Sequence, residues 1–260
     1  MAAGFIGSLT RLVSPRKQIA LENLNIVFPD KDTSWKEELL KKVYDHLSLS
    51  LTEYLCLSKK PERVLDWIHE VEGLDILSDL HAKGKGAVIL TGHVGNWELL
   101  GAWLSLKGFP VNAVIRDPND PGVAGILREY RKKTGLRTIS KGKVMTSAVR
   151  SAKKGDFVAL LADQDGGNTG YRIPFMGREC STVGGPAMVS ILADVELVPL
   201  YSYRVSPYVH NVVVHPPFSP PSSGDRNERI LETSRRCNFE IEKMIHAHPE
   251  QWLWLHRRWR

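Results

Sequence analysis

The chain has 260 residues, of which 42% are hydrophobic and 25% are charged, and its formal net charge is +6. This composition is that of a globular protein with one large domain or two small ones. No window of about 18 apolar residues is present, so we expect no membrane-spanning helix. The basic excess favours an acidic partner, such as nucleic acid, anionic lipid or an acidic protein.

The N-terminal residues and the cysteines indicate in which cellular compartment the protein works. The N-terminus lacks the layout of a signal peptide. Cys56, Cys180 and Cys237 lack the spacing of a zinc site, and we interpret them as inert buried thiols in a reducing cytosolic setting. Residues 4–13 place apolar side chains on one helical face with basic residues beside it. This segment is either a short interfacial anchor or an amphipathic helix packed on the body.

The first 80 residues are predicted to be entirely helical. Ser34 and Glu37 match a capping box, and leucines at helical spacing follow them. Helices are expected over 16–28, from Ser34 onward, in a short segment that begins at Pro61, and over 71–80. This part forms a helical cap that shelters an apolar site or presses on a membrane.

From Gly86 the pattern changes to alternating strands and helices, which indicates a mainly parallel sheet. Strands are predicted over 87–91, 111–115, 136–140, 157–161, 197–204 and 211–214. Helices are predicted over 97–106, 121–134, 144–153, 184–192 and 229–247. The predicted fold is therefore a single α/β domain over residues 1–260, a mainly parallel mixed sheet flanked by helices, with a helical part over 1–80 and a core over 81–260.

His93 lies on a turn between a predicted strand and a predicted helix, where α/β folds place functional groups. Gly92 and Gly95 allow a tight turn there. Glu98 follows near the start of the helix, and its carboxylate is expected to accept a hydrogen bond from one imidazole nitrogen. That bond would fix the tautomer and leave the other nitrogen as a base. The alternative is an isolated loop histidine beside an unrelated carboxylate that favours the helix start.

Several functional classes lack their motifs in this chain. It has no GxSxG elbow, no Walker A loop and no GxGxxG after a strand. His246 and His248 point to different faces of a helix end, so we expect no metal pair. Lysine and arginine are spread along the chain, and we expect no nucleic-acid partner.

A histidine–carboxylate dyad without a protein nucleophile suits deprotonation of a substrate hydroxyl that attacks an activated carbonyl. Arg131 and Asp163 are the polar residues we place nearest to the dyad. Asp163 belongs to a second polar turn, 162–167, that also follows a strand. A cation at 131 would hold a phosphate or support an oxyanion. The alternatives are a solvated helix face for Arg131 and a turn-capping role for Asp163.

Six segments, in order, resemble the bacterial lipid A late acyltransferases of the lysophospholipid acyltransferase superfamily. The resemblance covers the chain from about residue 16 to its end. The segments are RKQIALENLNIVFPD, TGHVGNWE with the H-x-x-x-x-E box, IRDPND, LADQDGG, IPFMGREC with STVGGPAMVS, and HPEQWLWLHRRWR.

The resemblance implies transfer of a fatty acyl group from acyl–acyl carrier protein to a hydroxyl of a lipid A precursor, in a glycerol-phosphate acyltransferase-like fold. It implies His93 as general base and Glu98 as its orienting partner. Arg131 and Asp163 resemble the other functional polar residues of the family, and Arg116 would line the substrate entrance. Asn96 and Asp165 are weaker substrate-binding candidates. Arg257 and Arg258 fit a phosphate-facing tail, with a frayed charged terminus as the alternative.

The resemblance also implies partners and a location. We expect an acyl carrier protein or acyl-CoA as donor substrate, a glycolipid acceptor and a membrane surface as partners, and no cofactor or metal. Family members begin with a membrane-spanning helix, so attachment to the cytoplasmic face of the inner membrane is expected, either peripheral or through a missing anchor. The alternatives are another glycolipid acceptor, such as a phosphatidylinositol mannoside or an aminolipid, a non-catalytic lipid-binding protein, and a hydrolase.

Overall fold

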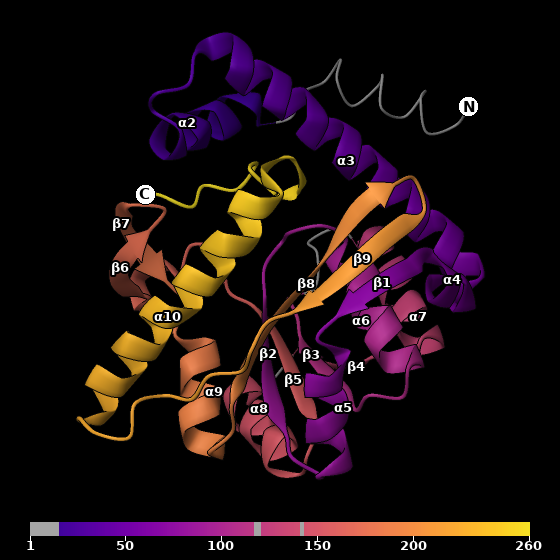
Figure 1. The fold of residues 1–260 in the computed structure, drawn as a ribbon, viewed down its shortest axis with the longest axis vertical. Coiled ribbons are helices and arrows are strands. Elements are labelled where there is room, and N and C mark those ends of the chain that lie inside the picture. The colour runs from indigo at the N-terminus through magenta and orange to yellow at the C-terminus, as the bar shows by residue number, and fades with distance from the viewer. Residues whose placement is uncertain (1–15, 117–120, 141–142) are drawn as a thin grey trace.

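A seven-stranded mixed sheet forms the centre of the computed structural model, which describes residues 16–116, 121–140 and 143–260 (Figure 1). The strand order is β1–β9–β8–β2–β5–β3–β4, and every neighbouring pair is parallel except β8 and β9. The strands are Ile68–Glu72 (β1), Ala87–Thr91 (β2), Val111–Val114 (β3), Arg137–Ile139 (β4), Phe157–Leu161 (β5), Leu197–Ser206 (β8) and Val209–Val214 (β9). The predicted fold class, α/β with a mainly parallel mixed sheet, is confirmed.

Helices cover both faces of this sheet (Figure 1). They are Lys17–Val27 (α2), Thr33–Lys59 (α3), Val64–Trp67 (α4), Leu74–Ala82 (α5), Trp97–Leu106 (α6), Pro121–Lys133 (α7), Val144–Lys153 (α8), Gly185–Ala193 (α9) and Arg226–Ala247 (α10). Strand β2 shows how the core divides. Val88 and Leu90 pack toward α8, α9 and α10, whereas Ala87 and Ile89 pack toward α5 and α6. Both faces of β2 are therefore buried, as the unbroken apolar run predicts.

The helix α3 begins earlier than predicted. Its N-cap is Asp32, whose carboxylate accepts a hydrogen bond from the Trp35 backbone N–H at 2.7 Å. The expected capping box at Ser34 and Glu37 is therefore wrong, because an aspartate two residues earlier already satisfies the first free N–H groups. Two further predicted helix starts, near Lys17 and at Pro61, are confirmed.

The N-terminal part also contributes a strand, which corrects the expectation that it is entirely helical. Residues 68–72 form β1 at the edge of the sheet, parallel to β9. The predicted helix over 71–80 begins only at Leu74, after Gly73 with φ 72°. A side chain at Gly73 would approach the Val214 carbonyl oxygen to 2.4 Å, so the strand-to-helix turn requires glycine here.

A short hairpin outside the main sheet was not predicted. Strands Tyr171–Phe175 (β6) and Arg178–Thr182 (β7) pair in antiparallel fashion and pack against α10. Met176 and Gly177 both have positive φ, 50° and 75°, as a two-residue hairpin turn requires. Pro174 and Gly177 are residue types typical of loops, so the sequence pattern did not indicate two strands here.

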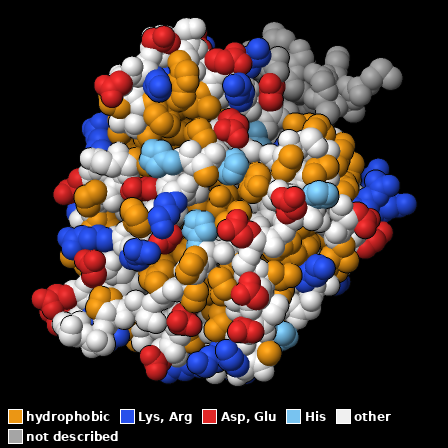
Figure 2. All heavy atoms as spheres, viewed as in Figure 1, with side chains coloured by type: hydrophobic (Ala, Val, Ile, Leu, Met, Phe, Trp, Pro, Cys, Tyr) orange, Lys and Arg blue, Asp and Glu red, His pale blue; other side chains and the backbone are white. Residues whose placement is uncertain are grey.

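Figure 2 shows one face of the molecule, where acidic and basic side chains are interspersed. The net positive charge is therefore not gathered into a single basic stripe on this face. The cysteines are free thiols, and Cys180 and Cys237 are buried. No described helix combines the length and apolar character needed to cross a membrane. The predicted amphipathic segment 4–13 lies outside the described residues.

Candidate active site

The ends of two neighbouring strands bring His93 and Asp163 together. Strands β2 and β5 are adjacent and in register, with Thr91 opposite Leu161. Each strand is followed two residues later by one of the two polar side chains. Gly92 permits this approach, since a Cβ there would lie 3.2 Å from the Asp163 carboxyl carbon. Parallel strands thus deliver both turns to one edge of the sheet.

The Asp163 carboxylate holds both the ring and the backbone of His93. Its Oδ1 lies 2.8 Å from His93 Nδ1, and its Oδ2 accepts the His93 backbone N–H at 2.7 Å. Trp252 donates its indole N–H to the same Oδ2 at 2.7 Å. Burial alone would raise the pKa of Asp163, but the neighbouring imidazole and these hydrogen bonds lower it to about 2. Asp163 is therefore ionised at neutral pH, and Nδ1 carries the proton.

The other imidazole nitrogen, Nε2, lies beside Gln164. His93 Nε2 lies 3.3 Å from the amide nitrogen of Gln164, and the His93 side chain is 18% exposed. The ring of Trp97 packs edge-on against the imidazole, with centroids 4.9 Å apart. With Nδ1 donating to Asp163, Nε2 is left as the acceptor, which is the arrangement of a general base.

Glu98 does not contact His93, so the predicted hydrogen bond between them is corrected. Its carboxylate instead forms a two-point ion pair with Arg131, whose Nε donates to Glu98 Oε2 at 3.0 Å and whose terminal nitrogen donates to Oε1. The physical reason is the direction of α6. The first turn of this helix presents Glu98 toward α7, where Arg131 is buried. The strand pairing of β2 with β5 gives His93 a different carboxylate.

Two tyrosines lie near this ion pair. Tyr54 from α3 and Tyr130 from α7 meet edge-on, with ring centroids 4.9 Å apart. Burial, followed by the charge of Glu98, raises the pKa of Tyr54 to about 12 and raises that of Tyr130 as well. Both phenols are therefore protonated at neutral pH. A small apolar slot of about 50 Å3 adjoins the ion pair, lined by residues of β2, β3 and α6.

The three remaining substrate-binding candidates lie in different places. Asn96 caps α6, accepting the Leu99 N–H at 3.1 Å, and donates to buried Glu53 at 3.0 Å. It therefore faces the interior, which argues against direct substrate contact. Arg116 is exposed just after β3, and the rest of its segment, 117–120, lies outside the described residues. Asp165 forms an ion pair with Arg260, whose Nε lies 3.3 Å from Asp165 Oδ2.

The C-terminal segment binds to the turn that carries His93, a contact that sequence reasoning missed. Leu253 donates its N–H to the His93 carbonyl at 3.1 Å, and Gly95 donates to the Gln251 carbonyl at 3.0 Å. His256 accepts the Asp165 backbone N–H at 3.0 Å. The expectation that Arg258 faces a phosphate is wrong. Its side chain is fully buried, donates to Thr182 Oγ1 at 2.7 Å and lies over the Phe175 ring.

A buried charged cluster lies directly behind the turn. Glu53 pairs with Arg204 and lies 3.0 Å from His210 Nε2, and it also accepts from Asn96. His46 Nε2 lies 3.1 Å from the Gly95 carbonyl oxygen. Burial and the charge of Arg204 lower the pKa of both His46 and His210 to about 3, so both are neutral at physiological pH. The described residues contain no group of three or more His, Cys, Asp or Glu side chains that could hold a metal ion.

Comparison with known proteins gives relatives along nearly the whole chain. A lipid A biosynthesis palmitoleoyltransferase of Escherichia coli is 27% identical over 259 residues, which cover 98% of this chain and 82% of that protein. A phosphatidylinositol mannoside acyltransferase of Mycobacterium tuberculosis is 26% identical over 208 residues, covering 77% of this chain and 62% of that protein.

A solved structure and a family model complete the comparison. The crystal structure of a 1-acyl-sn-glycerophosphate acyltransferase from Thermotoga maritima is 15% identical, with a TM-score of 0.38 over 87% of this chain and 97% of that one. The model of the bacterial lipid A biosynthesis acyltransferases matches residues 2–260. The resemblance inferred from the sequence segments is confirmed, and the chain belongs to the bacterial lipid A biosynthesis acyltransferase family.

Proposed function

We propose that the chain transfers a fatty acyl group from an acyl thioester to a hydroxyl of a lipid A precursor, with His93 as the general base. The observation that carries this proposal is the orientation of the His93 ring. Asp163 lies 2.8 Å from Nδ1, while Nε2 lies 3.3 Å from the Gln164 amide nitrogen and the His93 side chain is 18% exposed. Membership of the family supplies the reaction class.

In the proposed reaction, His93 Nε2 accepts the proton of the acceptor hydroxyl as its oxygen attacks the thioester carbonyl. A carbon–oxygen bond forms, and the tetrahedral intermediate collapses with cleavage of the carbon–sulfur bond. The imidazolium then returns the proton to the departing thiolate. Buried, ionised Asp163 stabilises the imidazolium between these two steps. General base catalysis of this kind contributes about 10²–10⁴-fold, and alignment of the two substrates contributes more.

We assign Glu98 and Arg131 a joint role as a fixed ion pair in the wall of the site. The first turn of α6 carries both Glu98 and Trp97, and Trp97 packs against the His93 ring. The pair therefore holds the start of α6 beside the imidazole. An acyl carrier protein is the donor we favour, because the net charge of +6 suits an acidic partner. Acyl-CoA is the alternative donor.

We further propose that the protein works at a membrane surface. Exposed apolar side chains lie on three elements: Leu51 and Leu55 on α3, Leu65 on α4 and Val205 near the end of β8. The ring of Trp67 on α4 packs at a tilt against that of Tyr208, which follows β8, with centroids 4.9 Å apart, and the Tyr208 N–H donates to Glu53 of α3 at 3.2 Å. Apolar groups on such neighbouring elements suit contact with lipid.

The test is acyl transfer by purified protein in detergent. Acyl–acyl carrier protein is supplied with a lipid A precursor, with a phosphatidylinositol mannoside, with a lysophospholipid or with no acceptor. A new acylated lipid A species in the mass spectrum, lost in His93→Ala, is the expected result. Thioester loss without an acylated lipid would favour a hydrolase, and no turnover with any acceptor would favour a lipid-binding protein.

A second acceptor has one observation in its favour. The mycobacterial relative, whose name gives a phosphatidylinositol mannoside as its acceptor, is about as similar in identity as the Escherichia coli palmitoleoyltransferase, 26% against 27%. Transfer to the mannoside alone would keep the chemistry at His93 and replace the acceptor.

A further inference from the structure

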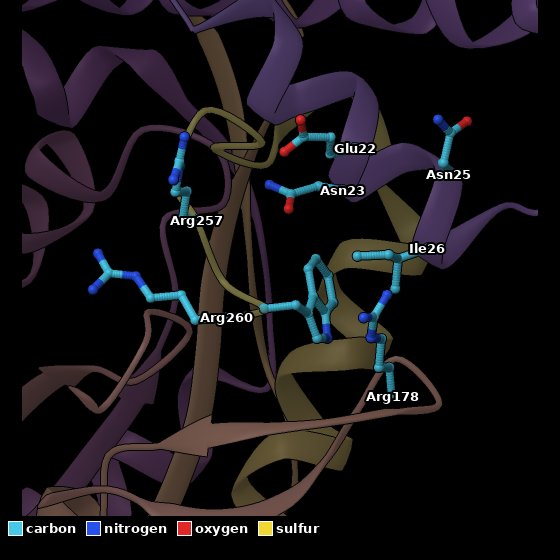
Figure 3. Close-up of a pocket in the computed structure, with 8 residues that line it drawn as sticks. Glu22, Asn23, Asn25, Ile26, Arg178, Arg257 and Arg260 are labelled. Carbon is cyan, nitrogen blue, oxygen red and sulfur yellow. The ribbon is translucent and has the colours of Figure 1, made fainter. Parts of the chain in front are cut away.

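A polar pocket of about 670 Å3 lies between α2, the β6–β7 hairpin and the C-terminal segment. Three arginines line it. Figure 3 shows Arg257 and Arg260 on one side and Arg178 on the other, with Glu22 and Asn23 of α2 between them. The arginines are distant in sequence, so the fold gathers them at this pocket.

The pocket has more positive charge than its own side chains neutralise. The guanidinium groups of Arg178 and Arg257 make no hydrogen bond or ion pair within the part of the chain that the structure describes. Arg260 pairs with Asp165 at 3.3 Å, and its side chain is 68% exposed. Glu22 is the one acidic residue in the lining. Gathering like charges costs free energy that a bound anion would recover.

Hydrogen bonds to neighbouring elements hold the C-terminal wall of the pocket in place. Asn23 is buried and donates to the carbonyls of Trp254 and His256, both at 2.7 Å. Trp259 donates its indole N–H to the Phe175 carbonyl at 3.1 Å. These bonds fix the tail that carries Arg257 and Arg260. The frayed charged terminus considered from the sequence is therefore not what this segment forms.

The pocket adjoins the proposed reaction centre. Asp165, the partner of Arg260, lies two residues after Asp163, which holds His93. His256, next to Arg257, accepts the Asp165 N–H at 3.0 Å. The tail that carries two of these arginines is thus bonded to the turn that carries Asp163.

We propose that Arg178, Arg257 and Arg260 form a binding site for a phosphoryl group of a substrate. Guanidinium groups match phosphate oxygens in two-point hydrogen bonds, and the lining is mostly polar, with Ile26 and Trp259 as its apolar residues. This inference rests on the proposed function, because it adds a subsite to the same centre. The phosphoryl group is carried either by the glycolipid acceptor or by the pantetheine arm of the donor.

The kinetic test uses Arg178→Gln and Arg257→Gln, with Arg172→Gln as the matched control. Arg172 lies on the same hairpin, pairs with Glu179 at 3.1 Å and does not line the pocket. Each pocket variant should raise one substrate's KM about tenfold with kcat within about twofold, as loss of a charge-assisted contact predicts. Arg172→Gln should match the wild type.

Two arms identify the source of the phosphoryl group. If it belongs to the acceptor, the KM increase appears with a phosphorylated acceptor and disappears when that phosphate has been removed. If it belongs to the donor, the KM for the acyl thioester rises instead, with every acceptor. Unchanged KM values for both substrates, or equal effects in Arg172→Gln, would overturn the inference.

A binding measurement separates this inference from the proposed function. Inorganic pyrophosphate should raise the melting temperature of the wild type and of Arg172→Gln, and should raise it less in Arg178→Gln and Arg257→Gln. Equal stabilisation of all four proteins would count against the pocket. If the wild type transferred no acyl group while this pattern appeared, the proposed function alone would fail.

Discussion

Asp163 and His93 are 70 residues apart in the sequence, yet one carboxylate binds both the ring nitrogen and the backbone N–H of the same histidine, at 2.8 and 2.7 Å. The ring contact selects the tautomer, and the backbone contact fixes the turn. A single side chain thereby fixes both the position of the His93 ring and its tautomer.

His93→Ala should lower kcat by about 10²–10⁴-fold, because it removes the proposed general base. Circular dichroism should show an unchanged fold, since the side chain is partly exposed and Asp163 keeps its hydrogen bonds from the His93 backbone and Trp252. Transfer by this variant near the wild-type rate would rule out His93 as the base.

Asp163→Asn should lower kcat by up to about 10⁴-fold while the protein remains folded. If the amide oxygen keeps the His93 and Trp252 N–H groups, its NH2 faces His93 Nδ1. The ring must then carry its proton on Nε2, so this nitrogen can no longer accept the proton of the acceptor hydroxyl. The matched control is Asp156→Asn just before β5, where the carboxylate pairs with Arg137 at 2.9 Å. Wild-type kcat in folded Asp163→Asn would contradict the proposed tautomer.

The ion pair of Glu98 and Arg131 predicts a different pattern. Glu98→Leu leaves a buried guanidinium without this carboxylate and should lower the free energy of unfolding by about 3 kcal/mol. Adding Arg131→Met should recover much of that loss, because both charges are then absent. Urea unfolding of the wild type, Glu98→Leu, Arg131→Met and the double variant measures the coupling.

Transfer should stay low in the double variant if the pair shapes the site, as we propose. Full recovery of kcat together with stability would assign the pair a purely structural role. The double variant can be compared with the wild type because each substitution, Glu98→Leu and Arg131→Met, replaces a charged side chain with an apolar one of similar length.

Local patterns predicted most of the central sheet correctly. The apolar run of β2, bounded by glycines, and the helix α6 after it are confirmed at their predicted residues. The edge strand β1 was missed because its partner, β9, lies about 140 residues later, and its half-exposed residues carry no strong strand pattern. The β6–β7 hairpin was missed because Pro174 interrupts β6 and Gly177 follows in the turn, and both residue types are typical of loops.

The partner of His93 shows why the site was only partly predictable. Sequence spacing favours the nearest carboxylate, Glu98, which lies five residues away. The actual contact depends on which strands are neighbours, and β2 lies beside β5 rather than β3, the next strand along the chain. Asp163 was selected as a nearby polar residue, but strand order cannot be deduced from alternating elements alone. Trp252 and Gln164 carried no signal of their own.

The buried histidines behind the turn predict a pH dependence of stability. His46 and His210 have pKa values lowered from 6.5 to about 3, so the unfolded chain binds more protons between these values. Their contribution to stability is complete above about pH 6.5 and is lost as the pH falls toward 3. Each should add a slope of about 1.4 kcal/mol per pH unit within that window.

Replacing one of these histidines should remove its share of the slope. Urea unfolding of His210→Asn between pH 4 and 6 should show a slope smaller than that of the wild type by about 1.4 kcal/mol per pH unit. His69→Asn is the control, because that side chain is 72% exposed. Equal slopes in the wild type and His210→Asn would show that His210 is not kept neutral by burial in the cluster with Glu53 and Arg204.

If α3 contacts the membrane, a single negative charge on its exposed face should weaken vesicle binding. Leu55→Glu should lower the fraction of protein that sediments with anionic phospholipid vesicles, raising the apparent Kd at least about tenfold. The reason is that burying a leucine contributes about 1.5–3 kcal/mol, and a carboxylate is also repelled by the anionic surface. Leu192→Glu, on α9 and 36% exposed, is the matched control and should bind like the wild type. Equal binding by Leu55→Glu and the wild type would place the lipid contact elsewhere, whereas a selective loss would orient the α3 face toward the bilayer.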